Sequence, residues 1–382
     1  MKGKISSRAS AVTPFIVMDV LEKAKEMEKM GEDIIHLEIG EPDFDTPEPI
    51  KEAAAKAMGE GHTHYTHSQG LLELREEICR YYHENYDVGI TPDRVVITSG
   101  TSPAMLLVFS ALLNSGDEVL LSNPHYSCYP NFIKYSGGIP IPFHVKEENN
   151  YLYPVDKIKE SINSRTAALV VNSPSNPTGA VLPRENLEAL SMLDIPIISD
   201  EIYHGLTYGE KAHSILEFDD HAIVVNGFSK LYAMTGWRLG YAIVPKELMR
   251  AIRNMQQNLF ICANSFVQHA AIAALKYCSK HVEKMRQEYD TRRKFILKNI
   301  KDTGLEIEGE PTGAFYVFAN AGKFSDDSYK LAFDILDKAK VALTPGIDFG
   351  SRGEGYLRIS YANSLENIGE GMRRLGRYFK NK

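Results

Sequence analysis

The sequence has little of several features that mark special classes of protein. No run of lysines or arginines stands out among its 382 residues, and the formal net charge is −7 with a pI of about 6.0. This charge gives no indication of nucleic acid or an anionic membrane as a partner. Only four residues are cysteines, too few for a disulfide framework and without metal-ligand spacing: Cys79, Cys128, Cys262 and Cys278.

Long apolar runs are also missing. No stretch is long enough to span a bilayer, and residues 1–8 have no apolar core like that of a signal peptide. Because we interpret the thiols as reduced, these absences together predict a soluble, cytoplasmic enzyme. With 43% apolar residues, a chain of this length can bury a sizeable core and form two domains.

Strand-like and helix-like segments alternate between residues 71 and 361, which predicts an α/β fold with a mainly parallel sheet covered on both faces. An amphipathic helix is expected at 16–30, ending at Gly31, and long helices at 246–277 and 281–301. Open sheets of this kind place their sites at the carboxyl ends of strands. The strands expected in this sheet are 94–98, 118–122, 166–172, 195–199, 222–226 and 238–244.

The most informative stretch contains Lys230, which lies between a short apolar strand and a run of small and aromatic residues. A lysine among apolar neighbours is biased toward its neutral amine, which can attack a carbonyl and form a Schiff base. Arg238 follows eight residues later, and its guanidinium is a planar fork of donors suited to a phosphate. An amine nucleophile beside a phosphate anchor is what pyridoxal phosphate requires.

This stretch reads S-K-x-x-x-M-T-G-W-R-x-G and closely resembles the cofactor-lysine segment of class I/II pyridoxal-phosphate aminotransferases. That family has the aspartate-aminotransferase fold (fold type I), and its other motifs occur here in the same order. The resemblance implies pyridoxal 5'-phosphate as cofactor, a homodimer and a seven-stranded sheet in a large domain at 45–282. A smaller α+β domain is implied at 283–382, with residues 1–44 as an N-terminal arm and part of that domain.

A turn of small residues after the strand at 94–98 opens a helix, where backbone N–H groups can approach an anion. The resemblance assigns Thr101 and Ser102 in this turn to the cofactor phosphate, together with Ser229 and Arg238. One departure is Gly227, since many members of the family carry a further serine three residues before the lysine.

Three other motifs correspond to family positions around the cofactor ring. Tyr126 follows a strand and matches the stacking position, and an aromatic ring there can lie on a flat pyridine. Asp200 ends an apolar strand, where a carboxylate is costly unless it meets a positive partner such as a protonated pyridine nitrogen. The resemblance places Tyr203 and Asn176, from the motifs D-E-x-Y and N-P-x-G, at the phenolic oxygen.

The substrate side is implied by two further matches. Arg358 is the one arginine in a strand-like segment, and a guanidinium pairs with a carboxylate through two parallel hydrogen bonds. The resemblance assigns Arg358 and Asn176 to the substrate α-carboxylate and gives Gly40, in a G-x-P-D-F loop, a backbone contact with it.

Three histidines close together, His62, His64 and His67, invite a metal site, but their spacing on a loop fits no common zinc pattern, and we expect no metal. The same loop matches the family's Y-x-x-x-x-G motif. By that match, Tyr65 reaches the phosphate in the partner subunit of the homodimer.

The resemblance implies transamination by a ping-pong mechanism, with Lys230 carrying the proton from the substrate Cα. A C–S β-lyase of the cystathionine type on the same scaffold remains an alternative, because the motifs do not separate the two. Some transcription regulators carry an aminotransferase-like domain, but the stretch before Ile16 has no room for a DNA-binding region.

The expected substrates are a 2-oxo acid and an L-amino acid with a neutral side chain: alanine, a branched aliphatic or an aromatic. One branch of aspartate aminotransferases carries a lysine for the distal carboxylate where this chain has Ser102, and the covering segment 14–18 is apolar. Burying a second carboxylate without a cation would be costly. Aspartate aminotransferase is the alternative. Glutamate and 2-oxoglutarate can still serve as the second pair, since Arg8 or Arg250 could swing in to supply a cation.

Overall fold

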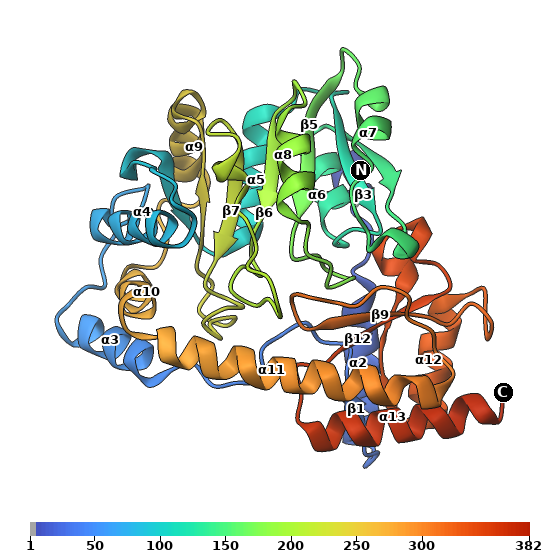
Figure 1. Cartoon of the computed structure of the whole chain (residues 1–382). Coiled ribbons are helices and arrows are strands. Elements are labelled where there is room, and N and C mark those ends of the chain that lie inside the picture. The colour runs from blue at the N-terminus through green and yellow to red at the C-terminus, as the bar shows by residue number, and fades with distance from the viewer. Residues whose placement is uncertain (1–4) are drawn as a thin grey trace.

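The computed structural model describes residues 5–382, and a seven-stranded sheet dominates it (Figure 1). The strand order is β2-β8-β7-β6-β5-β3-β4, and all neighbours are parallel except that β8 runs antiparallel to β2 and β7. The expected mainly parallel α/β fold is therefore confirmed. The strands are β2 (Val95–Thr98), β3 (Glu118–Asn123), β4 (Ile139–His144), β5 (Thr166–Asn172), β6 (Ile197–Asp200), β7 (Ile223–Gly227) and β8 (Gly240–Ile243).

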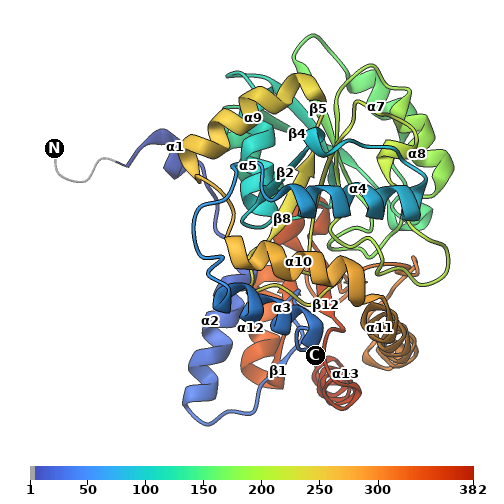
Figure 2. The ribbon, with the colours of Figure 1, turned by 90° about the vertical axis from the view of Figure 1, so that its left-hand side faces the viewer.

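Helices cover both faces of this sheet because its apolar side chains alternate between them. The strand residues that point to one face, such as Val96, Val119 and Val170, pack beneath α5 (Thr101–Leu112), α6 (Tyr129–Tyr135) and α9 (Lys246–Leu259). Val95, Ile97 and their equivalents face the other layer, which consists of α4 (Leu72–Tyr86), α7 (Val155–Ser161), α8 (Arg184–Ser191) and α10 (Ser265–Tyr277). Figure 2 shows α5 and α9 on one side of the strands and α8 on the other.

Two details differ from the sequence-based expectations. Strand β4 is absent from the strands expected from the sequence. It contains Pro140 and Pro142, which are tolerated because β4 is the edge strand and pairs only with β3. The long helix expected at 246–277 is wrong: α9 and α10 are separate helices. Ile261 between them has a left-handed backbone with φ of 67°, and the Asn264 side chain caps α10.

A second unit is built from both ends of the chain. Strands β11 (Thr344–Pro345), β12 (Tyr356–Ser360) and β9 (Tyr316–Asn320) form an antiparallel sheet. The remaining pair joins β1 (Ile35–His36) to β10 (Val341–Ala342) in parallel, which ties the N-terminal segment to the C-terminal region. The division at residues 44/45 and 282/283 stays a prediction. The other helices are α1 (Ser7–Ser10), α2 (Ile16–Lys29), α3 (Glu48–Gly59), α11 (Ser279–Asn299), α12 (Ser328–Ala339) and α13 (Leu365–Lys380).

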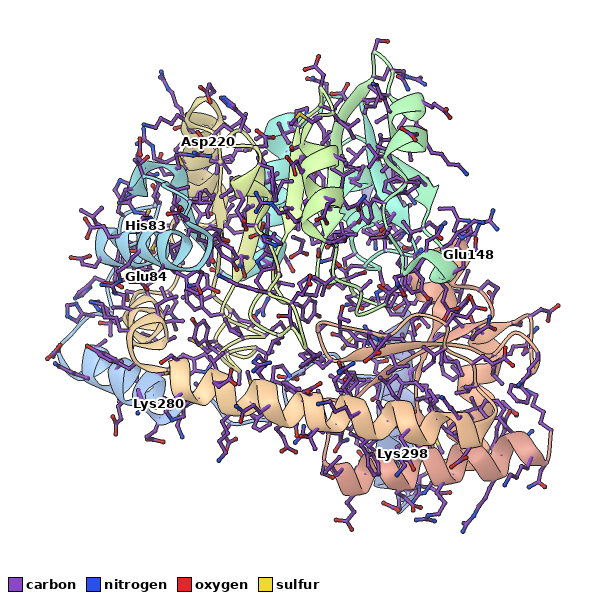
Figure 3. All side chains as sticks on the ribbon, viewed as in Figure 1. His83, Glu84, Glu148, Asp220, Lys280 and Lys298 are labelled. Atoms are coloured by element: carbon purple, nitrogen blue, oxygen red, sulfur yellow. The ribbon has the colours of Figure 1, made fainter. Side chains whose placement is uncertain are left out.

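Charged side chains cover the outside of these helices, as Glu84, Lys280 and Lys298 show in Figure 3. Within residues 5–382, no helix combines the length and the apolar character needed to cross a membrane. The polar residues of interest lie instead where the strands end. Asn172 and Asp200 are the last residues of the parallel neighbours β5 and β6, so the sheet itself places them side by side.

Candidate active site

A cavity of about 290 Å³ lies at the carboxyl ends of the central strands. Its wall combines the strand ends of the large sheet, residues from the small sheet and the start of α2. All the site residues expected from the sequence line it except Tyr65. These lining residues are Gly40, Thr101, Ser102, Tyr126, Asn176, Asp200, Tyr203, Ser229, Lys230, Arg238 and Arg358. The Tyr65 side chain is 80% exposed on the loop between α3 and α4.

Lys230 reaches the cavity from the segment that follows β7. Its Nζ donates a hydrogen bond of 2.6 Å to the carbonyl of Gly40. Burial lowers the pKa of Lys230 to about 8, and the positive charges of Arg358 and Arg238 act in the same direction, whereas Glu41 opposes them. The amine is therefore far more available as a nucleophile than that of an ordinary lysine.

Asp200 is a buried carboxyl group that also lines the cavity. It accepts a hydrogen bond of 2.6 Å from the Tyr129 hydroxyl and one of 3.2 Å from the N–H of Ile202. Burial raises the pKa of Asp200 to about 6, although both hydrogen bonds and the charge of Lys230 favour its ionised form. A cationic ring nitrogen fits this carboxyl, because it supplies the positive partner that these neighbours do not fully provide.

The turn between β2 and α5 forms an anion cradle. Gly100 has φ of 98°, and a Cβ there would lie 2.7 Å from a terminal nitrogen of Arg238, so only glycine allows the guanidinium this close. The same turn opens α5, and the free N–H groups at the start of a helix are suited to bind an anion. A side chain at Gly227 would lie 3.0 Å from the Cα of Gly240, which disfavours the serine that many of the family carry there.

Arg358 lies on β12 and is held on several sides. One terminal nitrogen donates to Asn176 Oδ1 at 2.9 Å, and the other donates to Thr344 Oγ1 at 3.1 Å and to the carbonyl of Glu38. The rings of Tyr316 and Phe349 flank the guanidinium, which lies 4.5 Å and 4.9 Å from their centroids. Its buried Nε–H has no hydrogen-bond partner among the described residues.

Two tyrosines of the site were missed by the sequence reasoning. Tyr316 comes from β9, and its hydroxyl pairs with that of Tyr203 at 2.7 Å. Tyr129 packs edge-on against Tyr126 with ring centroids 5.3 Å apart while it holds Asp200. The short P-H-Y-S-C-Y segment was a usable signal for Tyr129, because it lies one helical turn after Tyr126. Nothing local indicates Tyr316, since its partner is 113 residues away.

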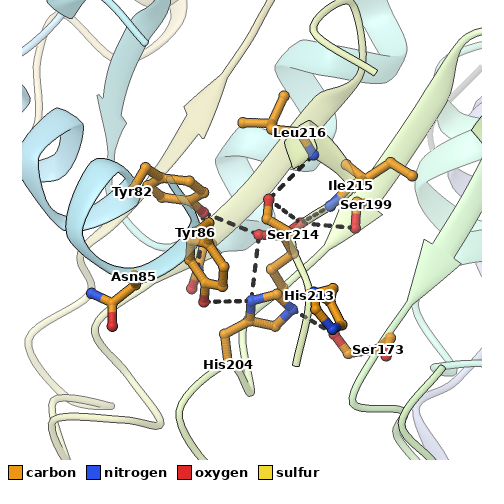
Figure 4. A network of polar contacts seen from close by, with 12 residues as sticks. Tyr82, Asn85, Tyr86, Ser173, Ser199, His204, His213, Ser214, Ile215 and Leu216 are labelled. Carbon is orange, nitrogen blue, oxygen red and sulfur yellow. Dashed lines mark hydrogen bonds and ion pairs between the residues drawn. The ribbon is translucent and has the colours of Figure 1, made fainter. Parts of the chain in front are cut away.

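A buried polar network supports the site from behind. Glu201, next to Asp200, accepts hydrogen bonds from Ser214 Oγ at 2.9 Å, the N–H of Ile215 at 3.0 Å and the hydroxyl of Tyr82 at 3.2 Å. Figure 4 shows Tyr82, Ser214 and His204 converging. Burial raises the pKa of Glu201 to about 7.

His204 extends this network to the N-P-x-G loop. Its Nε2 lies 3.0 Å from the carbonyl of Ser173, which can only accept, so Nε2 carries the proton. Its Nδ1 then accepts from the hydroxyl of Tyr86 at 2.8 Å (Figure 4). Burial lowers the pKa of His204 to about 3, in agreement with a neutral ring. The end of β6 and the loop that carries Asn176 are thus tied together.

Comparisons with known proteins agree with this geometry. The profile of the family "Aminotransferase class I and II" matches residues 32–375. A (5-formylfuran-3-yl)methyl phosphate transaminase from Methanocaldococcus jannaschii is 46% identical, covering 99% of this chain and all of its own. An aspartate aminotransferase from Pyrococcus horikoshii is 39% identical over 97% of this chain and 96% of its own. The crystal structure of an aromatic aminotransferase from Pyrococcus horikoshii superimposes with a TM-score of 0.88 at 39% identity, covering 94% of this chain and 99% of its own.

The fold and the reactive lysine thus define an enzyme of the fold type I group, which uses pyridoxal phosphate. The chain belongs to the class I and II aminotransferase family and is a transaminase that acts on amino and 2-oxo acids. The donor set described above fits the cofactor: an amine, a buried carboxyl without a full positive partner, and a cradle for an anion.

The lowered pKa of Lys230 predicts a distinctive pH profile for its chemical modification. In cofactor-free protein, reductive methylation of Lys230 should rise with a midpoint near pH 8, because only the neutral amine reacts. Lys51 is the control, since its hydrogen bond to Glu48 raises its pKa above the ordinary value. Peptide mass spectrometry measures both positions. Equal midpoints for the two lysines would contradict the burial argument.

Proposed function

We propose that this transaminase moves the amino group of an L-amino acid with a neutral side chain to a 2-oxo acid by a ping-pong mechanism. The observation that carries the proposal is the composition of the cavity wall. Phe15, Val17, Met18, Leu21 and Ile39 form an apolar part of it. A side chain of alanine, a branched aliphatic or an aromatic amino acid gains from contact with this surface.

The cations of the cavity support the same proposal. Lys230, Arg238 and Arg358 are the only lysines and arginines among the described residues that line it. Arg238 faces the anion cradle, and Arg358 is held in place to bind the α-carboxylate. Neither Arg8 nor Arg250 lines the cavity, so a second substrate carboxylate would be buried without a cation of its own.

The residue roles follow from the same geometry. Pyridoxal phosphate, when bound, supplies a carbonyl for the lysine amine and a ring that takes up the electron pair released at the substrate Cα. Thr101, Ser102, Ser229 and Arg238 hold its phosphate. Lys230, with its lowered pKa, takes the proton from the substrate Cα and delivers it to the C4′ carbon of the cofactor.

The remaining residues orient ring and substrate. Asp200 keeps the proton on the ring nitrogen, and Tyr126 lies against the ring face. Asn176 and Tyr203 donate to the phenolic oxygen. Arg358 binds the α-carboxylate through its guanidinium, which Asn176 holds in place. Gly40, whose carbonyl accepts a hydrogen bond from Lys230 Nζ, presents its backbone to the substrate carboxylate.

The named relatives act on different substrates: a furan-based aldehyde phosphate, aspartate and aromatic amino acids. The furan relative is the most similar of these three by identity, which favours an aldehyde on an aromatic ring as a second candidate amino acceptor. A ring in that substrate is compatible with the apolar wall. Aspartate transamination and C–S β-lyase activity remain the alternatives.

A substrate panel tests the proposed function. With 2-oxoglutarate or pyruvate as acceptor, kcat/KM for the best of alanine, valine and phenylalanine should exceed that for aspartate by at least about tenfold, or roughly 1.4 kcal/mol in transition-state binding. Cofactor absorbance reports each half-reaction. A preference for aspartate would overturn the neutral-substrate proposal, and release of pyruvate and ammonia from cystathionine would favour the β-lyase.

Replacing Asp200 separates stability from cofactor binding. The pKa of about 6 lies above the usual value of 3.8, so the contribution of Asp200 to stability falls as the pH rises from about 3.8 to about 6 and stays low above that. Cofactor-free Asp200→Asn should therefore be more stable than wild type at pH 7, by about 1–3 kcal/mol, and no more stable at pH 4. Its cofactor affinity should fall, because the ring nitrogen loses its negative partner. Denaturation at both pH values and cofactor titration measure these effects; an unchanged affinity would remove Asp200 from the site.

We also propose that the enzyme is a homodimer in the cytoplasm, in which Tyr65 contacts the phosphate of the partner subunit. An aromatic ring that is 80% exposed suits an interface, closed dimers are the commonest soluble assembly, and the four cysteines are unpaired.

Tyr65→Phe tests the contact of Tyr65 with the partner's phosphate. The variant should sediment as a dimer yet bind the cofactor several-fold more weakly, because only the hydroxyl is lost. Tyr277→Phe is the control, since that ring is also largely exposed, at 66%. A fully active monomeric wild type, or equal cofactor affinities in both variants, would contradict the proposal.

A further inference from the structure

The apolar wall of the cavity depends on a helix whose start is not capped by its own sequence. Phe15, Val17 and Met18 belong to the first turn of α2 or precede it directly. The residue in the capping position is Phe15, whose side chain has no oxygen with which to accept a hydrogen bond from the free N–H groups. Another part of the chain must therefore hold this helix start in place.

Asp348 provides that cap from the other end of the sequence. It lies on the short helix η5 (Gly346–Phe349), and its Oδ1 accepts the N–H of Ile16 at 3.0 Å although 332 residues separate the two. The carboxyl is only 8% exposed. Burial raises its pKa, whereas the N–H groups of Ile16 and Val17, Ser127 and the charge of Arg358 favour the ionised form. A carboxylate at a helix N-terminus also interacts favourably with the helix dipole.

A second contact holds the residues just before α2. The side chain of Asn131, on α6, accepts hydrogen bonds from the N–H and hydroxyl of Thr13 at 3.0 Å and 3.1 Å and donates to its carbonyl at 3.2 Å. Between the two anchors lies Phe15, whose ring packs edge-on against Tyr126 at 6.1 Å. The segment is thus fixed to the large sheet's helix layer on one side and to the small unit on the other.

We propose that Asp348 is a specificity-determining positioning residue, which caps α2 and thereby holds Phe15, Val17 and Met18 against the substrate side chain. The inference rests on the proposed function, since it explains how the apolar wall favours a neutral side chain. It does not place Asp348 in contact with substrate, because the residue is absent from the cavity wall. Its effect should appear in KM and in the choice between substrates, and hardly in kcat.

The experiment compares Asp348→Ala and Asp348→Asn with wild type, using the best neutral amino acid and aspartate. Asp348→Ala should raise KM for the neutral substrate about fivefold, the scale of losing one helix cap, with kcat within about twofold. The ratio of kcat/KM for the neutral substrate to that for aspartate should fall by a similar factor. Asp348→Asn keeps an acceptor for the N–H of Ile16 and should lie between wild type and Asp348→Ala.

Asp327→Ala is the matched control. Asp327 caps α12 by accepting the N–H of Lys330 at 2.9 Å and does not line the cavity. This variant loses a cap of the same kind, and its substrate ratio should stay at the wild-type value. Hydrogen exchange gives a second readout: the amides of residues 15–19 should exchange faster in Asp348→Ala and not in Asp327→Ala.

Two outcomes would overturn the inference: an unchanged substrate ratio in Asp348→Ala, or the same shift in Asp327→Ala. If Asp348→Ala does not fold, Asp348→Asn and Asn131→Ala take its place, and both should lower the ratio. The wild-type ratio alone tests the proposed function. The change in that ratio between variants tests the role of Asp348, whichever substrate the wild type prefers.

Discussion

The structure depends on the burial of two ionisable groups of opposite sign in one cavity. Asp200 and Lys230 follow neighbouring parallel strands, β6 and β7, and each group affects the charge of the other. Both have pKa values displaced toward the neutral form because burial outweighs their mutual attraction. Burying these two ionisable groups costs free energy of folding. A rigid frame around the cavity keeps them in place despite this cost.

Two consecutive residues, Asp200 and Glu201, are part of that frame. Successive side chains of a strand point to opposite faces, so Asp200 faces the cavity while Glu201 faces the polar network behind it. Through His204 and the carbonyl of Ser173, this network also fixes the loop that carries Asn176, which in turn holds Arg358. A buried chain of hydrogen bonds also runs from the carbonyl of Asp200 through Asn172 and Asn176 to Arg358, and it connects the residue proposed to hold the ring nitrogen with the residue proposed to bind the substrate carboxylate.

Much of the fold and site could be predicted because the motifs lie directly after apolar strands. Such strands, as at Asp200, are readable from local composition, and the parallel sheet then brings their ends together. Pairings between distant segments could not be predicted. Tyr316 meets Tyr203 across 113 residues, and Asp348 meets Ile16 across 332. The break between α9 and α10 was also missed, because the left-handed backbone at Ile261 is unusual for a β-branched residue and has no local signal.

The catalytic groups and the specificity wall have separate structural origins. Most of the groups around Lys230 lie at or just beyond the ends of strands of the large sheet, so the sheet sets their positions. The wall comes mainly from the start of α2, which η5 and α6 anchor and which packs on strands β10 and β11 of the small unit. Substitutions in the start of α2, in η5 or in α6 can therefore reshape the wall while the amine, the buried carboxyl and the anion cradle stay in place. Such a separation is compatible with the three different substrates in the names of transaminases that are 39% to 46% identical to this chain. Under the proposed function, substrate choice is accordingly decided at the contacts of α2 rather than within the motif that surrounds the lysine.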